Sequence, residues 1–84
     1  MQPNKLEASF STLVISIASN AVVNLGLEKN PQTNKIEKNL DIAQYSIDLL
    51  VLLKDKTKNN LTSHEQNYLE AIIQDLQLKF VQSK

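Results

Sequence analysis

The chain offers few side chains for catalysis, and they do not form a known catalytic pattern. Its only histidine, His64, precedes Glu65, which is how the HExxH zinc motif of metalloproteases begins. The motif needs a second histidine four residues after the first, but Tyr68 stands there. The sequence has no cysteine, no glycine-rich phosphate loop and no motif that would support a Ser-His-Asp triad. We therefore expect no enzyme activity, no metal and no cofactor, with His64 exposed in the first turn of a helix.

Two groups of charged residues could instead bind a partner. Three aspartates recur every seven residues and share one side of a helix: Asp41, Asp48 and Asp55. They could attract a basic partner or cations, but they are too far apart along the helix to share one metal ion unaided. Three lysines follow near the end of the same helix and could contact phosphates: Lys54, Lys56 and Lys58. We favour a solvated acidic face and cations that complement the helix dipole.

The overall charge disfavours nucleic acid and anionic lipid as partners. Nine lysines balance nine acidic residues in this 84-residue chain, so the formal net charge is zero. There is no arginine, the side chain best suited to bidentate phosphate contacts. With 42% hydrophobic and 21% charged residues, the composition is that of one small globular domain over residues 1–84.

An uncharged stretch from Ala8 to Leu27 raises the alternatives of a membrane span or a signal peptide. Seven serine, threonine and asparagine residues interrupt the stretch, which argues against a span. A signal peptide could be cleaved after Ala21, but Glu7 lies in what would be its positive region, and helical periodicity continues past that site. We expect a cytoplasmic protein without a membrane segment.

Hydrophobic periodicity predicts an all-α domain of three helices, at about residues 5–25, 36–57 and 63–82. Gly26, the only glycine, stands where a left-handed residue would end the first helix, with Val22 and Leu27 in contact as in a Schellman motif. Thr62 and Glu65 have the spacing of a capping box at the start of the third helix.

The second helix is apolar over roughly 260° of its surface, which is normal for a helix surrounded by others. Two neighbouring helices cannot cover so much surface, so we predict a homodimer or small helical-bundle homo-oligomer. The predicted interface comes from the first two helices: Phe10, Val14, Ile17, Ala21, Ile42, Tyr45, Leu49, Leu52 and Leu53.

Two segments carry a family resemblance, FSTLVISIASNAVVNLGL at residues 10–27 and NLDIAQYSIDLLVLLKDKTKNNLTSHEQNYLEAIIQDLQLKFV at residues 39–81. They resemble a family of short bacterial proteins of unassigned role, domain of unknown function eighteen-forty-four. Its members usually have glycine where Asn59 stands and often arginine where Lys79 stands. The resemblance implies a bacterial cytoplasmic protein and supplies no activity, cofactor or catalytic residue.

The most specific residues of this resemblance form a set: Leu25, Gly26, Asp48, Lys56, Thr57, Asn60, Leu61, Thr62 and Glu65. We interpret the segment from Lys56 to Glu65 as a tight corner between helices, in which Thr57 and Thr62 satisfy free backbone groups. Asp48 would face the first helix or a partner. The alternative is that these polar residues form a docking surface.

Two functions remain open from the sequence. The first is a non-enzymatic, homo-oligomeric protein–protein interaction module. The second is a small accessory subunit of a larger complex, such as a ribonucleoprotein, bound through the lysine-bearing corner. A site assembled from carboxylates across subunits is a weaker third interpretation.

Overall fold

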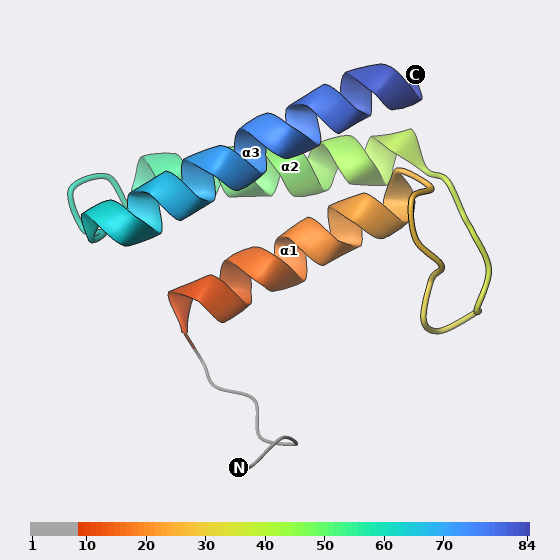
Figure 1. Ribbon diagram of the computed structural model, residues 1–84, viewed down its shortest axis with the longest axis horizontal. Coiled ribbons are helices and arrows are strands. Elements are labelled where there is room, and N and C mark those ends of the chain that lie inside the picture. The colour runs from red at the N-terminus through yellow and green to blue at the C-terminus, as the bar shows by residue number, and fades with distance from the viewer. Residues whose placement is uncertain (1–8) are drawn as a thin grey trace, which may run out of the picture.

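Three helices in alternating directions make up the computed structural model, which describes residues 9–84. They are α1 (Phe10–Asn24), α2 (Leu40–Lys56) and α3 (Ser63–Ser83), and each contacts the other two (Figure 1). The predicted all-α three-helix domain is confirmed. The shortest dimension of the molecule, 16 Å, corresponds to two stacked layers of helix, so every helix keeps an outer face.

The start of α1 is fixed by a side chain rather than by the apolar pattern. Ser9 is extended, and its hydroxyl accepts a hydrogen bond from the backbone N–H of Thr12 at 3.1 Å, as an N-cap residue does. The predicted start at residue 5 lies outside the described residues. Ser9 was also predicted to be helical, but it is the extended N-cap. The helix therefore begins at Phe10.

The end of α1 is the predicted Schellman motif. Gly26 has a φ of 81°, its N–H donates to the carbonyl of Val23 at 3.1 Å, and the N–H of Leu27 donates to the carbonyl of Val22 at 3.2 Å. Residue 25, predicted as the last helical residue, is the C-cap. The left-handed backbone here explains why the only glycine occupies this position.

The predicted start of α2 at residue 36 is wrong, because the helix begins four residues later. Asn39 is extended and its side chain accepts from the N–H of Ile42 at 3.2 Å, while its own N–H donates to the carbonyl of Asn24 at 2.8 Å. Ile36 is 54% exposed and gives no packing that would extend the helix. The preceding loop folds back on itself through a β-bridge between Asn30 and Lys35.

The core lies where the three helices meet. Its fully buried apolar members come in equal parts from the α1 segment with its C-cap, from α2 and from α3: Val14, Ala21, Leu25, Ala43, Ile47, Leu50, Leu69, Ile73 and Leu76. One polar residue, Ser46, is buried with them, and its hydroxyl accepts a hydrogen bond from the Asn20 amide at 2.7 Å. The uncharged polar side of α1 thus meets α2 closely, and the buried hydroxyl has a partner.

Replacing Gly26 by Ala should destabilise the domain by about 1–2 kcal/mol, because a Cβ strains the left-handed backbone. An added Cβ would meet Lys38 only at an ordinary 3.4 Å, so lack of space is not the cause. Gly26→Asn should lower the free energy of unfolding by less than Gly26→Ala, since asparagine tolerates this conformation. Urea unfolding followed by circular dichroism measures both variants, and equal losses would contradict the explanation.

The Asn20–Ser46 pair should respond unequally to truncation. Asn20→Ala leaves a buried hydroxyl without its partner and should cost about 1–3 kcal/mol of unfolding free energy. Ser46→Ala removes the buried polar group itself and leaves the Asn20 amide near solvent, so its cost should be smaller. The double variant should be no less stable than Asn20→Ala alone. A larger loss from Ser46→Ala in thermal or urea unfolding would refute this account.

Candidate functional site

Five of the nine predicted interface residues are used inside the chain. Val14 and Ala21 are fully buried, and Phe10, Ile17 and Leu53 pack against the core. Their apolar face is therefore used mainly for contacts with the other helices of the same chain. Periodicity identified the face correctly but not what covers it.

The other four form an apolar line on the outside of α2. Ile42, Tyr45 and Leu52 are exposed, Tyr45 by 62%, and Leu49 is half-buried. Their spacing of three, four and three residues is that of the a and d positions of a coiled coil. We name these four residues the outer seam.

The three predicted aspartates lie beside the outer seam on one side. Asp41, Asp48 and Asp55 are all exposed, and the Asp48 carboxylate accepts a hydrogen bond from the Gln44 amide at 2.8 Å. Asp48 therefore does not pack against α1, one of the two positions considered for it. At 100° per residue the aspartates lie roughly 60–100° from the middle of the seam around the helix.

The segment between α2 and α3 is a tight corner in which side chains satisfy backbone groups. The Thr57 hydroxyl donates to the carbonyl of Leu53 at 2.7 Å. Thr62 and Glu65 form the predicted capping box, with Glu65 N–H donating to the Thr62 hydroxyl at 3.1 Å and Thr62 N–H donating to Glu65 Oε1 at 2.9 Å. Asn59 takes the left-handed conformation with a φ of 71°. Glycine, which the family resemblance implies at this position in other members, adopts this conformation readily.

The remaining corner residues play different parts. Leu61 packs against the core, and the Asn60 N–H donates to the Thr57 carbonyl at 2.9 Å. Lys56 is exposed in the last turn of α2, where a cation complements the helix dipole. These contacts support the structural interpretation of the corner, and its role as a docking surface stays a prediction.

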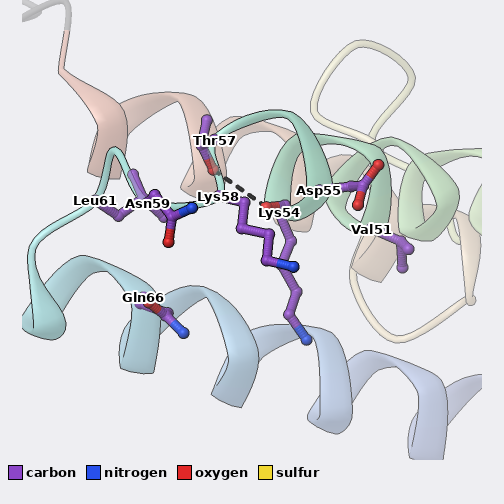
Figure 2. Close-up of a pocket in the computed structure, with 8 residues that line it drawn as sticks. All are labelled: Val51, Lys54, Asp55, Thr57, Lys58, Asn59, Leu61 and Gln66. Atoms are coloured by element: carbon purple, nitrogen blue, oxygen red, sulfur yellow. Dashed lines mark hydrogen bonds between the residues drawn. The ribbon is translucent and has the colours of Figure 1, made fainter.

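A pocket of about 380 Å³ opens beside this corner, which the sequence did not predict (Figure 2). Its lining comes from the end of α2, the connection and α3: Val51, Lys54, Asp55, Thr57, Lys58, Asn59, Leu61 and Gln66. Lys56 is not among these residues, so the structure divides the predicted lysine cluster in two. We name this cavity the corner pocket.

A second cavity, of about 300 Å³, lies between α1 and the loop that follows it. It is lined by uncharged residues: Ser19, Asn20, Val23, Asn24, Asn30, Pro31 and Gln32. The uncharged side of α1 is therefore partly occupied by the chain's own loop.

Residues 9–84 also show where the histidine and the carboxylates lie relative to one another. His64 is exposed in the first turn of α3. No group of three histidine or carboxylate side chains in this range is close enough to hold a metal ion. None of the helices formed by these residues has the length and apolar character needed to cross a membrane.

The geometry defines a small all-α domain with an apolar seam on one side of its central helix and a lysine-lined pocket at one corner. The chain belongs to the family described as Domain of unknown function (DUF1844), whose model matches residues 7–82. The resemblance stated from the sequence is thereby confirmed. No curated protein and no solved structure matches the chain.

Thr62→Ala should lower the unfolding free energy by about 1 kcal/mol, the usual cost of losing an N-cap side chain. Thr62→Ser keeps the accepting hydroxyl and should be close to the parent protein. Ser63→Ala, next to it in the first turn, is the matched control. Thermal unfolding measures all three, and a parent-like melting temperature for Thr62→Ala would contradict the capping role.

Proposed function

We propose that the protein is a non-enzymatic protein–protein interaction module that assembles with a second copy of itself through the outer seam of α2. The observation that carries this proposal is the seam itself, an exposed apolar line with coiled-coil spacing. A narrow line of this kind is what one helix presents to another, whereas scattered exposed apolar residues need no explanation. Self-association stabilises such a line by removing it from water.

The ends of the seam support a contact of defined length. Lys56 occupies the next position in the repeat after Leu52 and is exposed, so the apolar line ends there. At the other end it begins with Ile42, within the first turn of α2. Each partner of a standard interface buries about 800 Å². The four seam residues would form its centre, with the polar side of α1 and the aspartates at its rim.

The acidic side of α2 favours one orientation of the two copies. A twofold axis across the helices would pair them antiparallel and bring the same side of each helix together, so that Asp48 would approach its own equivalent. A twofold axis along the helices pairs them parallel and turns the aspartates toward the other side of the partner helix. That side is flanked by α1, whose outer polar residues, such as Ser16 and Ser19, are uncharged. We therefore propose a parallel pair.

The alternative of an accessory subunit in a ribonucleoprotein is less well supported. Lys54 and Lys58 line the corner pocket while Lys56 lies apart from it, so the three lysines do not form one cationic strip. The described corner also lacks an aromatic residue on which a base could stack. Retention of the protein on RNA that falls steeply with salt concentration would favour this alternative.

Light scattering over a dilution series tests the proposal. The parent protein should have at least twice the mass of the 9.5 kDa chain, and Leu52→Lys should weaken association by about 100-fold or more, because it puts a charge within the apolar line of contact. Leu78→Lys is the matched control: Leu78 on α3 is 58% exposed, against 51% for Leu52, and lies outside the seam. It should leave the mass unchanged.

Three results would contradict the proposal or part of it. A parent protein that is monomeric at all concentrations would exclude self-association. Equal weakening by Leu52→Lys and Leu78→Lys would show that the seam is not the contact. Tighter association of Asp48→Asn would indicate antiparallel helices with facing aspartates.

A further inference from the structure

We propose that the corner pocket binds a small carboxylate with a branched aliphatic body. The pocket lies on the side of α2 that faces α3, away from the outer seam, so this inference does not depend on self-association. Its volume of about 380 Å³ is within the range of small-molecule sites and would hold a ligand of amino-acid size. The chemistry of the lining decides which ligand fits.

Two ammonium groups converge on the pocket. Figure 2 shows the side chains of Lys54 and Lys58 extending from the end of α2 toward α3. Lys58 has no ion pair with any other residue of the 9–84 range. Lys54 pairs with Glu70 at 3.8 Å, a long contact between partly exposed groups that is worth little and can be exchanged. Asp55 also lines the pocket, and in the same view its carboxylate lies beside α2, apart from the ends of the two lysine side chains.

The pocket suits a carboxylate better than a phosphate. The backbone N–H groups of a helix N-terminus are the usual cradle for phosphate, but neither the N-cap Thr62 nor the first-turn residues Ser63, His64 and Glu65 of α3 line the pocket. No arginine is present in the chain to clamp a phosphate with two hydrogen bonds. Two lysines, each a point charge on a flexible stem, can contact the same carboxylate.

The rest of the lining selects the body of the ligand. Val51 and Leu61 supply aliphatic surface, and no aromatic ring lines the pocket, which fits a branched aliphatic group better than a flat ring. The Gln66 amide donates to Glu70 at 3.2 Å, which leaves its carbonyl oxygen free to accept from a ligand N–H. The Thr57 hydroxyl already donates its proton to the carbonyl of Leu53, so it has no proton left to donate to a ligand. A carboxylate, a neighbouring N–H and a branched side chain are together the features of an acylated leucine-like group.

This chemistry occurs in two sources, a free small acid and the C-terminal carboxylate of a peptide that ends in a branched residue. The experiment titrates the ¹⁵N-labelled full chain with N-acetyl-leucine and follows amide shifts by NMR. Saturable shifts should appear at pocket residues such as Val51, Lys58 and Gln66, and they should weaken as salt is added. N-acetyl-leucinamide, which has the same shape without the charge, should bind about tenfold more weakly or not at all.

Variants test whether Lys54 and Lys58 bind the ligand, and a control variant at the same helix end shows the effect of losing a charge outside the pocket. Lys54→Gln combined with Lys58→Gln should weaken N-acetyl-leucine binding about tenfold or more. Lys56→Gln, at the same helix end but outside the pocket, should bind like the parent protein. 4-Methylpentanoate and the peptide N-acetyl-alanyl-alanyl-leucine distinguish the sources: tighter binding of the peptide indicates a chain terminus, and equal binding indicates a free acid.

Three outcomes would overturn the inference. One is the absence of saturable shifts at the solubility limit of N-acetyl-leucine. Another is equal binding of the acid and the amide, a comparison made on the parent protein that does not depend on any variant folding. The third is equal weakening by Lys56→Gln, which would show that only general charge attraction is involved.

Discussion

The structure depends on how much of α2 its two neighbours can cover. The helix is apolar over roughly 260° of its surface, and residues 9–84 form only two other helices to place against it. α1 and α3 bury the side that carries Ala43, Ile47 and Leu50. The opposite side remains outside, because two helices at ordinary packing distance cannot enclose a third. The outer seam therefore follows from the number of helices around α2 as much as from the sequence of α2 itself.

The corners then fix which side of α2 is turned inward. Gly26 ends α1 abruptly, and the hydrogen bond from the Asn39 N–H to the Asn24 carbonyl ties the beginning of α2 to the end of α1. At the other end, Thr57 and Thr62 close the last turn of α2 and the first turn of α3. Each contact satisfies a backbone group that a helix end leaves free, so the positions of the helices are set at their ends as well as by the core.

Local chemistry made the corners predictable from the sequence. A single glycine, a capping box and an asparagine suited to a left-handed backbone each act within a few residues, so their types and spacing are sufficient. The beginning of α2 was missed because Ile36 continued the apolar pattern. Asn39 followed by Asp41 in the first turn carried the N-cap signal that would have corrected it.

Contacts between distant parts of the chain could not be predicted in the same way. Periodicity shows that Val14 and Ile42 both belong to apolar faces, but only the three-dimensional arrangement shows that Val14 is buried and Ile42 is exposed. The corner pocket is a similar case. Its residues come from α2, the connection and α3, and Lys54 and Lys58 are separated from Lys56 by the direction in which each leaves the backbone.

These directions give α2 three distinct sides in addition to its buried one. At 100° per residue Lys54 lies about 140° around the helix from Leu49, whereas Lys56 lies close to the line of the seam. A second copy on the seam would therefore leave the corner pocket open, and a ligand in the pocket would leave the seam free. The aspartates lie on the third side, where they bias the orientation of a partner helix. One helix that is too apolar for its own domain can thus serve the core, an assembly contact and a ligand site from different sides, and Asp55 borders both the contact and the pocket.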